Sequence, residues 1–258
     1  MLVKESFADL DTPTGSMRTH IFQPATPGRY PGVVLFSEIY QITGPMQRVA
    51  RRLAGRGLIV AAPEIYHEFE PPGSVFAYDK AGTDKGNRYK IEKELGAFDS
   101  DARVVLRHLA SLPECTGRLG SMGICIGGHL SLRAALDPTV AAAACFYATD
   151  VHQRSLGKGT KGDSLERLRE IEGELLMIWG RQDPHIPLEG RRTIHEALIR
   201  AGLDFTWHEF NAQHAFLRDE GYRYDPALAE IGYAMVFELF DRQLRRNGRA
   251  PDAGPGKR

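Results

Sequence analysis

The chain has 258 residues, of which 42% are hydrophobic, and its 33 basic and 33 acidic side chains give a formal net charge of zero. This balance argues against a nucleic-acid or membrane partner, because both favour a basic excess. The N-terminus lacks a basic region followed by an apolar stretch, and no run of about 18 apolar residues is present to cross a bilayer. We therefore expect a globular protein of the cytoplasm.

Short apolar or β-branched runs alternate with helical patterns along the chain. The predicted strands are Val3–Phe7, Arg18–Phe22, Val33–Phe36, Leu58–Ala62, Arg118–Met122, Val140–Tyr147, Leu175–Trp179 and Phe205–Phe210. The predicted helices are Pro45–Ala54, Asn87–Ser111, Gly127–Leu136, Ser164–Glu170, Leu188–Ala201 and Ala227–Arg246. This alternation predicts an α/β fold, with a mostly parallel sheet of about 7–8 strands and helices on both faces. The first two strands are close enough in sequence to form an antiparallel hairpin.

Three segments interrupt the alternation. Residues 66–87 contain consecutive prolines, several glycines and mixed charge, which predicts a long loop, and residues 150–163 have the composition of a mobile loop. The last residues lack a periodic apolar pattern. We expect one domain over residues 1–245 and a disordered tail over residues 246–258.

A cysteine stands at the turn between the predicted strand Arg118–Met122 and the helix that follows. The run Gly123-Ile-Cys125-Ile126-Gly127 matches the strand–nucleophile–helix turn G-x-S-x-G, with cysteine in place of serine. Glycines let the strand and helix approach, and the helix N-terminus favours a thiolate. Cys125 is therefore the predicted nucleophile, and the backbone amide of Ile126 is a predicted oxyanion donor.

The other two cysteines have contexts typical of inert thiols. Cys145 lies within an apolar run and Cys115 in a loop. An odd, sparse set of cysteines argues against a disulfide framework and fits a reducing compartment. None has the C-x-x-C spacing of a zinc site.

The acid and base of a hydrolase follow the nucleophile in that order along the chain. Asp183 follows the strand Leu175–Trp179 and is predicted to orient the imidazole. Its alternative role is an Asx turn that caps the next helix. His214 follows the last predicted strand through a short loop and is the predicted base. His185 is a weaker candidate for the base because it lies in the acid's own loop.

Four motifs together resemble the dienelactone hydrolase (carboxymethylenebutenolidase) family, in the family's order and over about residues 15–245. They are Glu38-Ile39-Tyr40, Gly-Ile-Cys-Ile-Gly-Gly, Gly-Arg-Gln-Asp-Pro and His-Ala-Phe-Leu-Arg. The resemblance implies that Glu38 contacts the thiol of Cys125, holding it protonated or accepting its proton until substrate arrives. It also implies that the amide of Ile39 is the second oxyanion donor. The alternative for Glu38 is an ordinary salt-bridged acid at a strand end.

The same resemblance implies a binding site for a substrate carboxylate. Arg218 matches a family arginine four residues after the catalytic histidine, and Arg88 and Tyr89 lie near another arginine and a tyrosine of the family. The alternative for both arginines is a solvated helix charge. The segment 66–87 departs most from the family pattern, and the loops 66–87 and 150–163 are expected to build the pocket that selects the substrate.

These residues predict hydrolysis of a lactone or carboxylic ester by a Cys125–His214–Asp183 triad through a thioester. The expected partner is a small-molecule substrate that can bear a carboxylate, and no metal or organic cofactor is required. One alternative is a carboxylesterase or thioesterase for neutral esters. Another, of a different class, is a non-catalytic binding or redox-sensing protein whose Cys125 oxidises.

Overall fold

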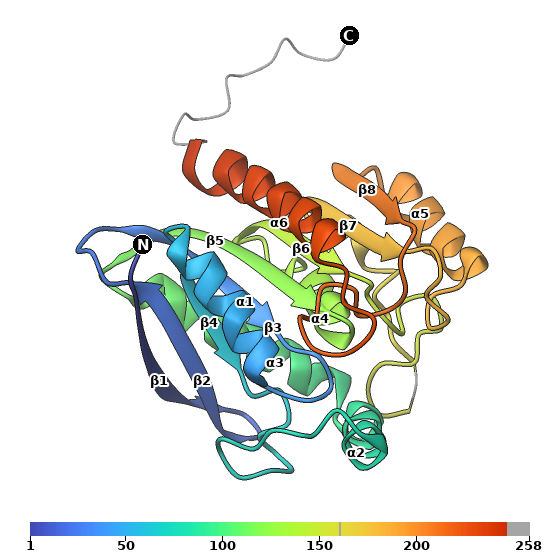
Figure 1. Cartoon of the computed structure of the whole chain (residues 1–258), viewed down its shortest axis with the longest axis horizontal. Helices are drawn as coiled ribbons and strands as arrows, with labels where there is room; N and C mark the ends of the chain where they lie inside the picture. Colours follow the sequence, from blue (N-terminus) through green and yellow to red (C-terminus); the bar gives the residue numbers. More distant parts are fainter. Residues whose placement is uncertain (160, 247–258) are drawn as a thin grey trace, which may run out of the picture.

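The computed structural model describes residues 1–159 and 161–246. Eight strands form one sheet in the order β1-β2-β4-β3-β5-β6-β7-β8 (Figure 1). They are β1 (Val3–Thr12), β2 (Gly15–Pro24), β3 (Tyr30–Phe36), β4 (Ile59–Pro63), β5 (Cys115–Ile124), β6 (Val140–Phe146), β7 (Glu174–Gly180) and β8 (Phe205–Phe210). β1 and β2 form the predicted hairpin, and every pair from β4 to β8 is parallel. The predicted α/β fold is confirmed.

Helices cover the sheet on both faces. They are α1 (Gly44–Gly55), α2 (Lys80–Glu92), α3 (Leu95–Ser111), α4 (Ile126–Ala134), α5 (Leu188–Ala201) and α6 (Pro226–Phe240). α1 and α6 lie on one face of the sheet, and α3 and α4 lie on the other (Figure 1). Across the described part of the chain, no helix combines the length and apolar character that a membrane crossing needs.

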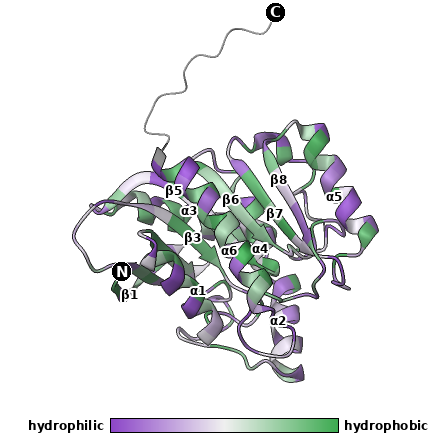
Figure 2. Ribbon diagram, turned by 45° about the horizontal axis from the view of Figure 1, so that its top comes forward, coloured by the Kyte–Doolittle hydropathy of each residue, from purple (hydrophilic) through white to green (hydrophobic). Residues whose placement is uncertain are grey.

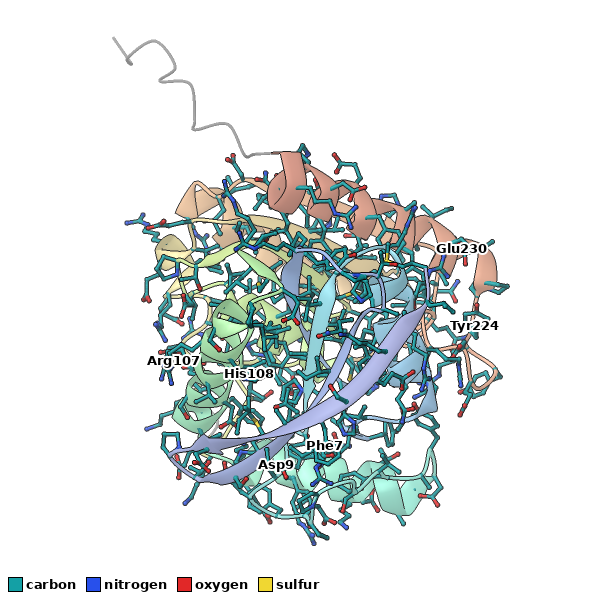
Figure 3. The ribbon with its side chains drawn as sticks, turned by 90° about the vertical axis from the view of Figure 1, so that its left-hand side faces the viewer. Phe7, Asp9, Arg107, His108, Tyr224 and Glu230 are labelled. Atoms are coloured by element: carbon teal, nitrogen blue, oxygen red, sulfur yellow. The ribbon has the colours of Figure 1, made fainter. Side chains whose placement is uncertain are left out.

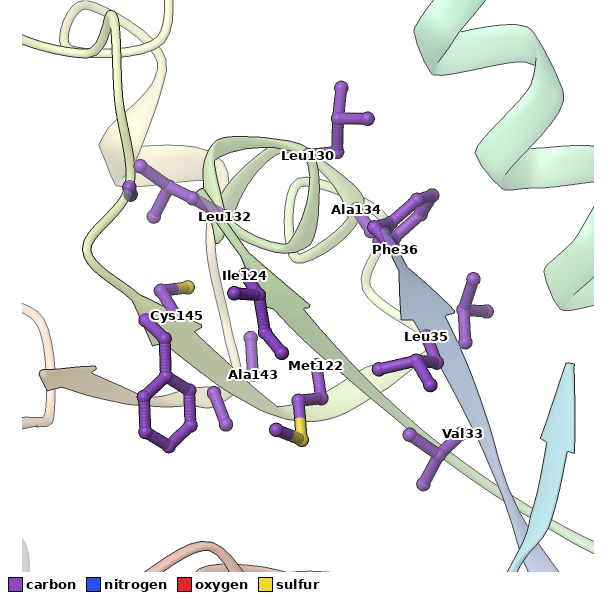
Figure 4. Packing of buried hydrophobic residues seen from close by; sticks show 14 of the residues in the cluster. Val33, Leu35, Phe36, Met122, Ile124, Leu130, Leu132, Ala134, Ala143 and Cys145 are labelled. Atoms are coloured by element: carbon purple, nitrogen blue, oxygen red, sulfur yellow. The ribbon is translucent and has the colours of Figure 1, made fainter. Parts of the chain in front are cut away.

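The central strands are apolar because both of their faces are covered. Hydrophobic residues concentrate along β3, β5 and β6, and their side chains pack under α4 (Figures 2 and 4). Four consecutive alanines in β6 leave room for α4 to approach the sheet closely. The edge strand β1 instead carries exposed residues such as Phe7 and Asp9 (Figure 3). The turn that carries Cys125 therefore lies beside the buried centre of the sheet.

The predicted loop over residues 66–87 is wrong in its second half, because α2 begins at Lys80. Asp79 supplies the helix start: its carboxylate accepts a hydrogen bond from the amide of Gly82 at 2.8 Å. The turns that precede the helix carry the prolines and Gly73. The segment was predicted to be a loop because of its glycines. Gly82 and Gly86 instead lie inside the helix, where close packing leaves no room for a Cβ atom.

The predicted helix Asn87–Ser111 is two helices, α2 and α3, separated by extended backbone at Lys93 and Glu94. The break follows from a buried contact of Lys93. Its ammonium lies 2.6 Å from Asp101 Oδ2, 2.9 Å from Glu68 Oε1 and 3.0 Å from the carbonyl oxygen of Ile65. A continuous helix would carry Lys93 past these acceptors.

Two further helix predictions change in detail. The predicted helix Ser164–Glu170 is reduced to a 3₁₀ turn, Leu168–Glu170. The predicted helix Ala227–Arg246 ends as an α-helix at Phe240, and a π-helical turn continues to Arg246. Arg246 is thus not in the disordered tail that we expected, and residues 247–258 of that tail lie outside the described residues. The single-domain boundary and the mobility of residues 150–163 stay predictions.

Candidate active site

Cys125 occupies a strained turn between β5 and α4. Its φ of 64° and ψ of −122° are rare for a residue with a side chain. A Cβ at Gly123 would collide with the backbone of Gly127, and a Cβ at Gly127 would collide with the carbonyl group of Phe36. The amide of Cys125 donates to the carbonyl oxygen of Phe146 at 3.1 Å. Strand and helix therefore approach as closely as the glycine pattern predicts, with the thiol at the turn.

His214 and Asp183 are brought together by the loops that follow β8 and β7. His214 Nδ1 lies 2.6 Å from Asp183 Oδ2, and Asp183 Oδ1 accepts from the amide of His185 at 2.8 Å. Both triad candidates are almost fully buried. Cys125 lies close enough to His214 for its charge to act on the imidazole, so the structure brings the three predicted triad residues together.

The surroundings of His214 favour its charged form. Burial by itself lowers the pKa of His214, but the negative charge of Cys125 and the hydrogen bonds to Asp183 and Cys125 raise it to about 10. His214 is therefore an imidazolium at neutral pH as long as Cys125 carries its charge.

The imidazole of His214 is held between two rings. Tyr147 packs edge-to-face against it with ring centroids 4.8 Å apart, and His185 does so from 4.7 Å. Tyr147 is fully buried and has a φ of 35°, so its backbone is strained as well. Motif reasoning missed Tyr147, because an apolar strand end gives no signal that its ring packs against the predicted base.

Glu38 follows β3 and lies at the cavity with only 2% of its surface exposed. Burial raises its pKa, and this outweighs the opposing charges of Arg218 and His214. Its Oε1 lies 3.5 Å from an Nη of Arg218. The resemblance implied a contact with the thiol of Cys125. The ion pair in this structure joins Glu38 to Arg218 instead.

The two predicted oxyanion donors lie at the ends of neighbouring strands. Ile126 is the first residue of α4, directly after Cys125, and Ile39 follows β3 and lines the cavity. Helix α2 packs closely against Ile39, because a Cβ at Gly86 would collide with the Ile39 carbonyl oxygen. This contact holds the backbone next to the predicted oxyanion amide.

A cavity of about 400 Å³ opens over Cys125 and His214. One wall is a face of α2 formed by Thr83, Asn87 and Lys90, which are spaced about one helical turn apart. Motif reasoning missed Lys90. The spacing is visible in the sequence, but it carries information only once residues 80–92 are known to be helical.

Arg88 and Tyr89 are not among the residues that line this cavity. The guanidinium of Arg88 is 57% exposed and lies 3.7 Å from Glu92 Oε1, so its side chain points away from the site. The Tyr89 hydroxyl donates to Glu70 Oε1 at 2.6 Å. The register of α2 places Lys90 on the cavity side, and Arg88 and Tyr89 on other sides of the helix.

Only one group of side chains in the described residues has a spacing suited to a metal ion: His67, Glu68 and Asp101. The ammonium of Lys93 lies among them, 2.6 Å from Asp101 Oδ2 and 3.3 Å from His67 Nε2. Because the centre already holds a fixed positive charge, this cluster does not fit a second cation. It ties the segment before α2 to α3.

Comparison with known proteins gives one family. Its profile, described as the dienelactone hydrolase family, matches residues 17–244. A Saccharomyces cerevisiae protein described as a "Putative carboxymethylenebutenolidase" is 43% identical and covers 95% of this chain and 94% of its own length. The "Carboxymethylenebutenolidase" of a Pseudomonas species is 26% identical, and the similarity covers 88% of this chain and 91% of that protein.

Among solved structures, a Klebsiella pneumoniae protein described as a "Putative Dienelactone Hydrolase" superposes with a TM-score of 0.82. It is 22% identical and covers 94% of this chain and 100% of its own, so it supports the fold. The profile match extends over most of the chain, and the yeast relative is similar along nearly its whole length. The chain therefore belongs to the dienelactone hydrolase family.

Proposed function

We propose that this protein hydrolyses a lactone or carboxylic ester through a thioester on Cys125. Membership of the dienelactone hydrolase family indicates a hydrolase of lactone or ester bonds, and the named relatives are carboxymethylenebutenolidases. The single observation that carries the mechanism is the position of Cys125 at a strained elbow beside His214, whose Nδ1 is hydrogen-bonded to Asp183.

In the first half of the reaction the charged sulfur of Cys125 attacks the substrate carbonyl carbon. The oxygen becomes an oxyanion that the amides of Ile126 and Ile39 stabilise, a contribution of about 3–4 kcal/mol for each donor. The C–O bond to the leaving group then breaks. His214 gives its proton to the departing alkoxide, and Cys125 is left as a thioester.

The same step resets the base. The charge of Cys125 is the largest influence that raises the pKa of His214, and acylation removes that charge. The pKa of His214 therefore falls when the thioester forms, which favours release of its proton. Neutral His214 then takes a proton from water, the resulting hydroxide attacks the thioester, and Cys125 leaves as thiolate. Asp183 holds the tautomer throughout.

Substrate recognition in this proposal uses Arg218. A substrate carboxylate would replace Glu38 as the partner of Arg218, and the planar guanidinium suits a bidentate pair. The Glu38–Arg218 separation of 3.5 Å is long for a charged hydrogen bond, so this exchange breaks a weak contact. The raised pKa of Glu38 lets the displaced carboxyl take up a proton.

Cys125→Ala tests the mechanism, with Cys145→Ala as the matched control. Cys145 is fully buried one strand away, and burial raises its pKa to about 12. Cys125→Ala should lower the hydrolysis of 4-nitrophenyl acetate and of a dienelactone at least about 10³-fold. Cys145→Ala should leave both rates within about twofold, and only an enzyme with Cys125 should gain an acyl mass. Equal rates for wild type and Cys125→Ala would rule out the thioester.

A second candidate is a carboxylesterase for neutral esters. It is favoured by the two ion pairs in the cavity, Glu38–Arg218 and Asp150–Lys90, which neutralise two of its cations. This alternative keeps the triad. It predicts that Arg218→Ala leaves hydrolysis of neutral esters intact and that an added substrate carboxylate brings no gain.

A further inference from the structure

The cavity has three cationic side chains in its lining: Lys90, Arg218 and Arg223. Lys90 donates to both carboxylate oxygens of Asp150, at 2.9 and 3.1 Å. Arg218 faces Glu38 at 3.5 Å. Arg223 differs from both, because no carboxylate within 1–159 and 161–246 pairs with it, and its Nε donates to the hydroxyl of Tyr222 at 3.2 Å.

Lys90 is held in an ion pair with Asp150. The pair is largely buried, with 16% of Lys90 and 7% of Asp150 exposed, and Ser155 also donates to Asp150 at 2.9 Å. An anion that took Lys90 would leave Asp150 as a buried carboxylate without its cation, which is strongly unfavourable. Lys90 therefore serves to hold the loop after β6 against α2.

Arg218 is available to an anion only after a displacement. A ligand carboxylate must first separate it from Glu38, which lines the same cavity and is 3% exposed in its side chain. Until that exchange occurs, Arg218 and Glu38 together present no net charge. An incoming anion therefore needs another cation to hold it at the cavity.

Arg223 meets this need by position and by chemistry. It lies in the segment between β8 and α6 and lines the cavity together with His185 and Arg218. Burial, the charge of His214 and, among weaker effects, the charge of Arg223 lower the pKa of His185, so this neighbour is neutral near pH 7. The guanidinium of Arg223 is thus the unneutralised charge at this part of the lining.

We infer that Arg223 is a specificity-determining residue that binds the carboxylate of an anionic ester or lactone substrate. The inference rests on the proposed function and adds to it a second cation outside the motifs that implicated Arg218. A substrate carboxylate would pair with Arg223 without displacing any protein carboxylate. The ligand class is a small carboxylic-acid monoester or lactone, with its anionic group a few bonds from the scissile carbonyl.

Two esters of equal chain length separate charge from shape: mono(4-nitrophenyl) glutarate and 4-nitrophenyl pentanoate. Arg223→Gln should raise KM for the glutarate ester about tenfold, the loss of one partly exposed charged hydrogen bond. Its kcat should stay within about twofold, because the triad is untouched. KM for the pentanoate ester should not change. An equal change for both esters, or none for either, overturns the inference.

Arg192→Gln is the matched control, because Arg192 is exposed on α5 and is not part of the cavity lining. It removes the same net charge from the protein. Both kinetic constants should remain as in wild type for both esters. If Arg192→Gln also raises KM for the glutarate ester, the effect is general charge attraction and the role of Arg223 is disproved.

A binding experiment distinguishes failure of this inference from failure of the proposed function. Free glutarate should slow the alkylation of Cys125 by iodoacetamide, and the glutarate concentration for half protection should rise about tenfold in Arg223→Gln. This readout needs no turnover. Activity that survives in Cys125→Ala would disprove the thioester while this result still supports Arg223. Protection that is absent from wild type, or equal in the variant, disproves the role of Arg223.

Discussion

The two sides of the cavity are built in different ways. On the triad side, Cys125, Asp183 and His214 each follow the carboxyl end of a parallel strand, and their strands β5, β7 and β8 are close in the sheet. On the opposite side, α2 does not directly follow a strand: it begins at Lys80, well after β4 ends at Pro63. The sheet therefore positions the candidate triad, whereas contacts between distant side chains position the opposite wall of the cavity.

Those contacts on α2 can be named. The hydroxyl of Tyr66 donates to the carbonyl oxygen of Gly86 at 3.0 Å, and the hydroxyls of Tyr40 and Thr83 are 2.9 Å apart. Just beyond the helix, Lys93 is fixed in its buried acidic cluster. If the two sides are as independent as this suggests, changes on one should alter catalytic rate and changes on the other should alter stability or recognition.

Asp183→Asn changes the predicted acid on the triad side and should have the largest effect of these substitutions. The amide retains an acceptor for the His185 amide but cannot stabilise the imidazolium of His214, so kcat should fall roughly 10³- to 10⁴-fold. Urea unfolding should report a native-like fold. The control Asp204→Asn, at an exposed position, should keep kcat within about twofold. A loss below about tenfold in Asp183→Asn would show that Asp183 acts as a cap and not as the acid.

Lys93→Met removes the buried cation that lies just beyond the end of α2. It leaves Asp101 and Glu68 without their buried cation, which should lower the free energy of unfolding by about 3–5 kcal/mol. Chemical denaturation measures this directly. Lys80→Met, at a position 88% exposed, should change stability by no more than about 0.5 kcal/mol. Similar stabilities for the two variants would show that the cluster does not hold α2.

Cys125→Ala should also change the titration of His214. The charge of Cys125 raises the pKa of His214, so its removal should lower that pKa from about 10. His214 would then lose its proton at a lower pH in the variant than in wild type. NMR of the imidazole across pH 5 to 11, with His108 as an internal reference far from the triad, would measure the shift. An unchanged titration would contradict the proposed resetting of the base.

Gly86→Ala joins the two sides and should have the smallest effect. The added methyl would press on the carbonyl of Ile39, shift the backbone next to the Ile39 amide and lower kcat about tenfold, a fraction of one donor's contribution. Gly96→Ala is its control, because nothing lies within 4 Å of a Cβ there. That variant should retain kcat and gain about 0.5–1 kcal/mol of stability. Equal kcat values in the two variants would mean that α2 does not position Ile39.

Most of the triad side could be predicted because its signals are local. The glycines around Cys125 prescribe a tight turn, and the order of strand ends places Asp183 and His214 in the loops that should follow. Each signal lies within about ten residues of chain. The structure brings the three residues together, with His214 hydrogen-bonded to Asp183 and next to Cys125, and their catalytic roles stay predictions.

The α2 side could not be predicted in the same way. The glycines of residues 80–92 indicate a loop by composition, yet Gly82 and Gly86 are packed inside a helix against Ala77 and Ile39. The helix register turns Arg88 outward and Lys90 inward. Neither the packing of the glycines nor the register of α2 can be read from residues 80–92 alone, because each depends on the segments that pack against the helix.

The sequence by itself determined the parallel sheet, the elbow at Cys125 and the chain order of its partners, because periodicity and turn chemistry act over short distances. Only the tertiary structure decided the end of α2 at Lys93, the pairing of Glu38 with Arg218, and the unpaired state of Arg223 among the described residues. Ion pairs join segments far apart in the chain. The partner that each charge takes follows from burial and geometry, which no local pattern records.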